Sequence, residues 1–246
     1  MKPPDWDNVA QAYAAMSHES RHLVVFPVLL DLLEQQSPKR ILDVGGGDGR
    51  FAEAAARRLP QSSVDAWDSS PAMTALALER ARESKSFRVL QEKPPLCTYD
   101  AVILTAVWMG WETDEQCEDE LRQLAESATD DGILLITVTH PCFRQERFST
   151  FSTDFALPWY FDNGRPFTVH VEADNKRIQL SNTHWNLSAM SGQLSAASLN
   201  IERLHELPDL PSSVGDGGSP WLVVQASRKR RHVLDPAPDP DVARSA

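Results

Sequence analysis

The sequence predicts an α/β protein whose mostly parallel sheet is covered by helices on both faces. Two observations predict this fold class, and a third marks where the pattern ends. A short apolar run, a glycine-rich turn and a helix-forming stretch follow one another over residues 40–59. Strand-like and helix-like segments then alternate as far as Thr139, which is typical of a parallel sheet with right-handed crossovers. After Thr139 this alternation stops, and residues 140–168 are rich in proline and aromatic residues without clear periodicity.

The individual elements are predicted from apolar periodicity and from helix-ending residues. Residues 5–35 are expected to be helical with a break near Ser17 and His18, and Pro60 ends a later helix. The strands expected up to Thr139 are 40–44, 64–68, 87–90, 100–105 and 132–139, and the helices between them are 49–59, 71–83 and 114–128. Beyond it we expect a hairpin of strands at 169–172 and 177–180, a helix at 187–198, and strands at 201–206 and 221–226.

Composition bounds the class of protein. The chain has 246 residues, which suits one domain with a substantial core. Its net charge of −11 argues against a nucleic-acid surface, which needs a basic stripe. Cys97, Cys117 and Cys142 lack paired spacing, so neither a disulfide framework nor a metal site is expected. No apolar stretch has the length of a membrane span and no signal-peptide pattern is present, so we expect a cytoplasmic protein with no membrane partner.

The most specific signal is the run from Ile41 to Arg50, which reads Ile-Leu-Asp-Val-Gly-Gly-Gly-Asp-Gly-Arg. Glycines allow a sharp turn and a close approach to a ligand. A dinucleotide site needs a third glycine where Arg50 stands, which disfavours a dehydrogenase. The pattern Asp-x-Gly-x-Gly-x-Gly instead resembles the first motif of class I S-adenosylmethionine-dependent methyltransferases. The residues that this resemblance assigns to the cofactor are Asp43, Gly45, Gly46, Gly47 and Gly49.

A second acid stands where this interpretation needs it. Asp68 ends the second predicted strand, about 20 residues beyond the glycine turn, where a carboxylate can accept both ribose hydroxyls. Ser70 is expected to cap the next helix, with Pro71 in its first turn. The sequence Asp68-Ser69-Ser70-Pro71 is similar to the Asp-x-Ser-Pro of the family, which implies that Asp68 and Ser69 contact the cofactor.

The resemblance covers the chain from residue 5 to about residue 227. It implies a Rossmann-like, seven-stranded, mostly parallel sheet with helices on both faces, an antiparallel last strand, and a small insert after the fifth strand. Residues 1–231 would then form a single domain, with an N-terminal helical lid at 1–35 and a substrate lid at 140–186. Residues 232–246 are expected to be a disordered tail, because residues 235–246 alternate proline and aspartate.

Further cofactor contacts are expected at strand ends and in the lid. Thr105 ends the fourth strand, where the family contacts the methionine part of the cofactor. Tyr13 resembles the lid tyrosine of the family, and its phenol would bind the cofactor carboxylate or act in catalysis by orienting the substrate. The family's acid for adenine has no clean match here, so Gln91 or Glu92 is expected in that role.

The substrate side is predicted from unusual residues near strand ends. His140 follows the fifth strand and is a candidate catalytic base, or else a histidine bonded to the loop backbone. Trp108 and Trp111 would form an aromatic wall beside the sulfonium, or else pack in the core. Arg21 would pair with a carboxylate of cofactor or substrate, or else lie at the surface. The predicted substrate-binding residues are Trp108, Phe143, His184, Trp185 and Arg21.

The favoured function is a methyltransferase of the kind found in secondary metabolism, with S-adenosyl-L-methionine as cofactor and a small molecule as substrate. The same motif fits an enzyme that breaks another bond of the sulfonium, by aminocarboxypropyl transfer or by an internal cyclisation that releases methylthioadenosine. A non-catalytic binding protein is the third hypothesis, and the two intact acids Asp43 and Asp68 argue against it. The sequence does not indicate an oligomeric state.

Overall fold

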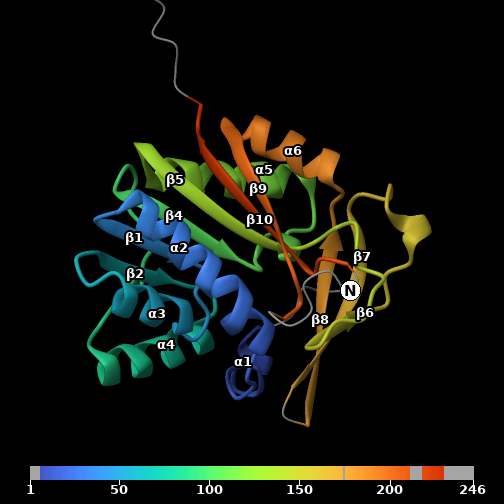
Figure 1. Ribbon diagram of the computed structural model, residues 1–246, viewed down its shortest axis with the longest axis horizontal. Helices are drawn as coiled ribbons and strands as arrows, with labels where there is room; N and C mark the ends of the chain where they lie inside the picture. Colours follow the sequence, from blue (N-terminus) through green and yellow to red (C-terminus); the bar gives the residue numbers. More distant parts are fainter. Residues whose placement is uncertain (1–5, 174, 211–217, 230–246) are drawn as a thin grey trace, which may run out of the picture.

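A computed structural model of the chain describes residues 6–173, 175–210 and 218–229 (Figure 1). The predicted disordered tail at 232–246 lies outside these residues. The strands are β1 (Arg40–Val44), β2 (Ser63–Trp67), β3 (Arg88–Val89), β4 (Tyr99–Thr105), β5 (Ala128–Thr139), β6 (Phe151–Thr153), β7 (Arg165–Ala173), β8 (Lys176–His184), β9 (Leu199–Leu207) and β10 (Trp221–Arg228). The helices are α1 (Trp6–Ala14), η1 (Arg21–Val25), α2 (Phe26–Gln36), α3 (Arg50–Arg58), α4 (Pro71–Ser84), η2 (Trp108–Gly110), α5 (Asp114–Ser127), η3 (Leu157–Trp159) and α6 (Leu187–Ala196).

The centre of the molecule is a seven-stranded sheet with the order β3–β2–β1–β4–β5–β10–β9. Every pairing among β1 to β5 is parallel, whereas β10 pairs antiparallel with both β5 and β9. The predicted α/β fold with an antiparallel last strand is therefore confirmed. In this topology the carboxyl ends of β1, β2 and β4 meet at one edge of the sheet, where open parallel sheets bind their ligands.

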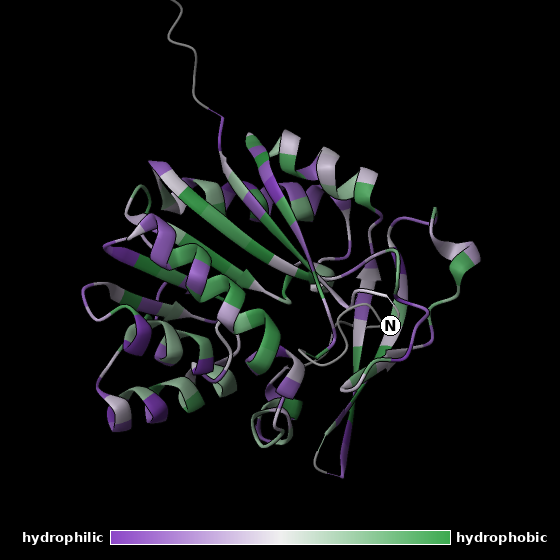
Figure 2. Ribbon diagram, in the orientation of Figure 1, coloured by the Kyte–Doolittle hydropathy of each residue, from purple (hydrophilic) through white to green (hydrophobic). Residues whose placement is uncertain are grey.

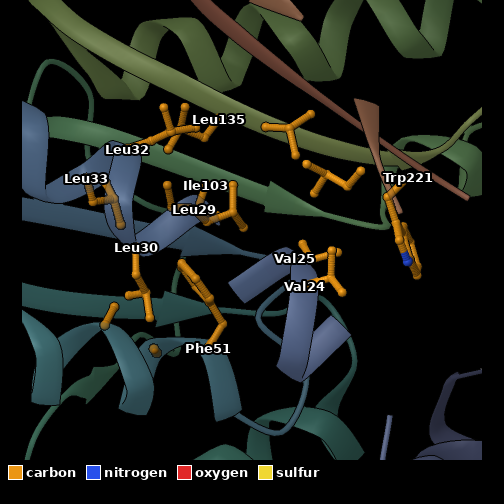
Figure 3. Close-up of a cluster of buried hydrophobic side chains, with 14 of the residues drawn as sticks. Val24, Val25, Leu29, Leu30, Leu32, Leu33, Phe51, Ile103, Leu135 and Trp221 are labelled. Carbon is orange, nitrogen blue, oxygen red and sulfur yellow. The ribbon is translucent and has the colours of Figure 1, made fainter. Parts of the chain in front are cut away.

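Different helices cover the two faces of this sheet. Leu29 of α2 and Phe51 of α3 lie with Ile103 of β4 in one buried cluster (Figure 3). On the other face, Leu121 of α5 and Leu194 of α6 belong to a second cluster with side chains of β4, β5 and β10. The central strands are mainly hydrophobic, whereas the helices alternate hydrophobic and hydrophilic positions (Figure 2). Burial on both faces explains why the strands read as continuous apolar runs.

The segment between β5 and α6 forms a separate three-stranded sheet of β6, β7 and β8. The predicted hairpin lies within β7 and β8, but both strands are longer, because the pairing continues to Arg165 opposite His184. β6 was not expected, since it has only three residues and is held by its pairing with β7. This small sheet lies beside α1, and its last strand, β8, runs toward the start of α6 (Figure 1).

Two local signals from the sequence are confirmed. Ser70 caps α4, because its Oγ accepts a hydrogen bond from the backbone N–H of Met73 at 3.2 Å, and Pro71 begins the helix. The N-terminal helical region breaks where expected, between α1 and η1, and His18 in the break has a left-handed φ of 50°. Within the described part of the chain, none of the helices has the length and apolar character needed to cross a bilayer.

Candidate functional site

A cavity of about 380 Å³ lies at the carboxyl ends of β1, β2 and β4. The glycine turn after β1 and the residues after β2 line it. Residues of α1, η1, α5 and β8 also contribute to the lining. Of the residues singled out in the sequence, those that line this cavity are Tyr13, Arg21, Asp43, Gly45, Gly46, Gly47, Asp68, Ser69, Thr105 and Trp111.

The glycine turn requires residues without a Cβ at two positions. Gly45 has a φ of +63°, and a Cβ added there would lie 2.3 Å from Cγ2 of Val107, in the segment after β4. A Cβ on Gly46 would lie 2.9 Å from Oδ2 of Asp43, while its N–H donates to the carbonyl of Trp67 at 3.1 Å. The turn is therefore pressed between the ends of β2 and β4, which leaves its backbone as one wall of the cavity.

Replacing Gly45 by alanine is expected to lower the stability of the turn and with it the affinity for the cofactor. The left-handed φ costs about 1–2 kcal/mol in a residue that carries a Cβ, and the contact with Val107 adds strain. The double variant Gly45→Ala with Val107→Ala should recover part of the loss, because only the steric component is removed. Calorimetric titration with S-adenosylhomocysteine measures both. Equal affinities in the single and double variants would show that Val107 does not constrain the turn.

Asp68 is held in place by two backbone N–H groups. Its Oδ2 accepts from Gly47 at 2.9 Å and its Oδ1 from Ser70 at 2.8 Å. Burial raises the pKa of Asp68, and these two hydrogen bonds oppose the shift. The carboxylate thus ties the glycine turn to the start of α4 and lines the cavity with its remaining lone pairs.

Two buried polar atoms in the cavity wall lack partners among the described residues: Oδ2 of Asp43 and Oγ1 of Thr105. Asp43 is only 1 % exposed. Burial, aided by the negative charge of Asp68, raises the pKa of Asp43 to about 8. Buried polar groups are almost always hydrogen-bonded, so this pair indicates that a ligand completes the site. An ammonium group and a neighbouring polar group of an amino-acid ligand fit them.

The part of the cavity lining that comes from the N-terminal helical region is aromatic and basic. The Tyr13 ring packs on Trp6 and His18, with centroid separations of 5.3 and 4.2 Å, and the Arg21 guanidinium lies 5.0 Å from its centroid. In the described part of the chain, no carboxylate lies within ion-pair distance of Arg21. Nε2 of His18 donates to the carbonyl of Tyr13 at 2.8 Å, and burial lowers the pKa of His18 to about 3. A carboxylate in the cavity would therefore find its positive partner in Arg21.

His140 does not line this cavity, and its hydrogen bonds favour the alternative of a histidine bonded to the loop backbone over a catalytic base. Its Nδ1 accepts from the backbone N–H of Cys142 at 3.2 Å, which leaves the proton on Nε2, 2.8 Å from Oε1 of Glu206. Burial lowers the pKa of His140, although Glu206 opposes the shift. With both ring nitrogens bonded and the side chain buried, His140 is a structural residue that joins β5 to β9.

His184 is also structural. Its Nε2 donates to the carbonyl of Tyr160 at 2.8 Å, and its Nδ1 accepts from Nη1 of Arg144 at 2.6 Å. Burial and the charge of Arg144 lower the pKa of His184 to about 4. Arg144 is itself buried, which lowers its pKa to about 9, and its guanidinium lies over the ring of Phe167. This cluster fastens the small sheet to the end of β5 and lies outside the cavity lining.

Three other residues that were predicted to contact the substrate do not line the cavity and pack against protein instead. Phe143 packs against the ring of His140 at 4.8 Å. Trp108 is buried and donates from Nε1 to Oε1 of Gln193 at 3.0 Å, so it packs with the core. Trp185 is buried and donates to the carbonyl of Trp111 at 3.3 Å. The aromatic wall is thus provided by Trp111, which lines the cavity, with Trp185 behind it.

Two predicted cofactor residues lie outside the cavity lining. Gln91 is exposed, and among the described residues neither it nor Glu92 borders the cavity, so no adenine contact is assigned. Gly49 instead serves packing, because it has a φ of +80° and a Cβ there would lie 2.7 Å from Cζ of Phe87. It is the N-cap residue of α3.

Several residues of the cavity wall were missed from the sequence. His22 and Asn182 line it, although they come from η1 and from the far strand of the small sheet. Arg50 also lines it. Of these three residues, only Arg50 could have been found from the sequence, because it occupies the position of the third glycine in a dinucleotide motif. Among the described residues no group of three or more His, Cys, Asp or Glu side chains is placed to hold a metal ion.

The fold and the cavity define a Rossmann-like protein whose cavity lies at the carboxyl ends of its parallel strands. The model of the methyltransferase domain family matches residues 16–186, which is more than half of the chain. The chain therefore belongs to the methyltransferase domain family. The predicted class is confirmed, and with it the predicted cofactor, S-adenosylmethionine.

Similar proteins agree with this assignment. A trans-aconitate 2-methyltransferase of Mycobacterium marinum is 35 % identical over 102 residues, which are 41 % of this chain and 36 % of that protein. A malonyl-[acyl-carrier protein] O-methyltransferase of Halalkalibacterium halodurans is 25 % identical over 146 residues, covering 54 % and 52 %. The chain thus spans about a third to a half of the length of these relatives. The crystal structure of an S-adenosylmethionine-dependent methyltransferase from Clostridium acetobutylicum has the same fold, with a TM-score of 0.60, 11 % identity and coverage of 91 % and 96 %.

Proposed function

We propose that the protein transfers the methyl group of S-adenosylmethionine to a small molecule bound in the same cavity. The observation that supports this is that two groups of residues from different elements line one cavity. Asp43, Thr105 and Asp68 lie at strand ends of the large sheet and offer acceptors for the cofactor, whereas Arg21, Trp111 and Asn182 come from η1, the segment after η2 and β8. Methyl transfer from a sulfonium requires mainly that donor and acceptor be held in line at short distance.

The acceptor that we propose is a small organic acid. Arg21 supplies a positive charge without an acidic partner among the described residues. Guanidinium groups bind carboxylates with paired hydrogen bonds. The names of the two relatives specify trans-aconitate and a malonyl group, both of which are acids. Trans-aconitate is therefore the first acceptor to test, followed by citrate and malonate.

The test is product analysis with the purified protein and S-adenosylmethionine, with and without these acids. Formation of S-adenosylhomocysteine together with a methylated acid supports the proposal. Methylthioadenosine formed from S-adenosylmethionine alone identifies the alternative reaction, in which the bond to the aminocarboxypropyl group breaks. Tight binding of S-adenosylhomocysteine without any product, over a wide set of acceptors, favours a binding protein.

Replacing Arg21 by glutamine tests which carboxylate it meets. We expect the KM of an acid acceptor to rise about fivefold, because a half-exposed charged hydrogen bond worth about 1 kcal/mol is lost. Affinity for S-adenosylhomocysteine is expected to stay the same. Steady-state kinetics with the acid and calorimetric titration with S-adenosylhomocysteine make the comparison. If affinity for S-adenosylhomocysteine falls, while that for methylthioadenosine, which has no carboxylate, does not, Arg21 binds the cofactor and not the acceptor.

A further inference from the structure

The helix α1, which covers the cavity with Trp6 and Tyr13, is attached at both of its ends. At its C-terminal end, Nη1 of Arg50 donates to the carbonyl of Met16 at 2.8 Å, and Nη2 donates to the carbonyl of Ala14. The last carbonyls of a helix have no partner within the helix, so a guanidinium is a natural cap there. Arg50 thus performs a task that no glycine at this position could perform.

The N-terminal end of α1 is attached to a different helix. Oδ1 of Asp7 accepts from Oγ of Ser70 at 2.5 Å and from the backbone N–H of Ala72 at 3.1 Å. These donors belong to the N-terminal end of α4, where the helix dipole also favours a negative charge. Because Ser70 also donates its N–H to Asp68, this attachment is next to the ribose acceptor.

The guanidinium of Arg50 is fixed on the glycine turn. Its Nε lies 2.8 Å from Oδ2 of Asp48, and the same oxygen receives Nη2 of Arg80 at 3.0 Å. Nε of Arg80 also donates to the carbonyl of Asp48 at 2.8 Å. One nitrogen of Arg50 therefore anchors it to the cofactor-binding turn, while the other two hold the end of α1.

We propose that Arg50 and Asp7 are positioning residues that latch α1 over the cofactor, and that opening of this latch limits cofactor exchange. Both attachment points lie on segments that line the cavity, namely the glycine turn and the start of α4. α1 lies between the α3–α4 layer and the small sheet (Figure 1). The proposal rests on the cofactor site of the proposed function, and it requires no particular acceptor.

The latch predicts a specific kinetic signature. All its atoms are protein atoms, so breaking it destabilises the closed position of α1 to the same extent in free and in cofactor-bound protein. A change that favours opening in both states raises the association and dissociation rates together and leaves their ratio nearly unchanged. A residue that merely contacts the cofactor changes the dissociation rate and the dissociation constant in parallel.

The experiment measures association and dissociation of S-adenosylhomocysteine by stopped-flow fluorescence with the full-length protein. Asp7→Ala and Arg50→Met each open one end of α1. We expect both rates to rise about 5- to 20-fold and the dissociation constant to change less than about threefold, as lost charged hydrogen bonds imply. Gln11→Ala on the exposed side of α1 and Arg57→Met on α3 are the matched controls, which should leave both rates unchanged.

The Asp7→Ala variant distinguishes the latch from a direct contact with the cofactor. Arg50 lines the cavity and could touch the cofactor, whereas Asp7 is not among the described residues that line it. The Arg50→Lys variant keeps one charged donor and should recover part of the slow exchange. A rise of the dissociation rate alone in Asp7→Ala, or unchanged rates in both latch variants, would overturn the proposal. Neither result depends on turnover, so a failure of the latch is distinguishable from a failure of the proposed methyl transfer.

Discussion

Replacing Asp43 by asparagine is expected to make the stability of the protein less dependent on pH. Burial raises the pKa of Asp43 from 3.8 to about 8 in the folded protein. The folded state therefore binds one proton more than the unfolded state between these values, and stability falls as pH rises through this range. The stabilising contribution of the neutral carboxyl is complete at low pH and is lost as pH passes through about 8.

The measurement is the melting temperature of the cofactor-free protein at pH 6 and at pH 9. The wild type should lose about 5–10 °C relative to Asp43→Asn, because about two pKa units correspond to about 3 kcal/mol in a chain of this size. Comparison with asparagine removes the pH dependence that the other groups contribute. Parallel curves for the two proteins would mean that the carboxyl of Asp43 titrates normally.

The same residue couples cofactor binding to protons. An ammonium group next to Oδ2 of Asp43 favours the charged carboxylate, so binding below pH 8 releases a proton. Affinity for S-adenosylhomocysteine should therefore rise with pH up to about that value. Titration calorimetry in two buffers of different ionisation enthalpy counts the released proton directly. In Asp43→Asn the proton release should disappear.

Replacing Asp68 by alanine is expected to weaken cofactor binding by about 1–3 kcal/mol, the cost of losing hydrogen bonds to a charged acceptor. Two effects add. In the proposed cofactor site the ribose hydroxyls would lose their acceptor, and the N–H groups of Gly47 and Ser70 lose the carboxylate that positions them. Calorimetric titration with S-adenosylhomocysteine measures the loss.

Asp100 provides a matched control for this change. It too accepts two backbone N–H groups, from Lys39 at 2.8 Å and Arg40 at 3.0 Å, but at the opposite edge of the sheet. Asp100→Ala should leave cofactor affinity unchanged. Unchanged affinity in a folded Asp68→Ala protein would remove Asp68 from the ribose site.

The part of the cavity lining made by the glycine turn and the strand ends was predictable from the sequence, because its signals are local. Asp43, the glycine turn and the Ser70 cap lie within about thirty consecutive residues, and each is recognised by a turn, a strand end or a helix start. Their neighbours in space are mostly their neighbours in sequence. For the same reason the parallel sheet followed from the alternation of strands and helices.

The rest of the cavity lining was not predictable in the same way. His140 is removed from the cavity by Glu206, which lies 66 residues further along the chain. Trp108, predicted to contact the substrate, packs in the core, whereas Trp111 lines the cavity. Trp108 begins the short helix η2 and bonds Gln193 of α6, and Trp111 follows the end of η2. Asn182 enters the cavity wall through the pairing of β7 with β8. Such placements arise from contacts between distant segments, which a single sequence does not reveal.

The small sheet of β6, β7 and β8 pairs with none of the described strands of the large sheet. It nevertheless places Asn182 in the cavity. Under the proposed function, substitutions around Asn182 in β7 and β8 are expected to change which acceptor the cavity takes and to leave the strand order of the large sheet as it is. Variation of acceptor specificity would then be separable from cofactor binding, and these two strands are the place to introduce it by design.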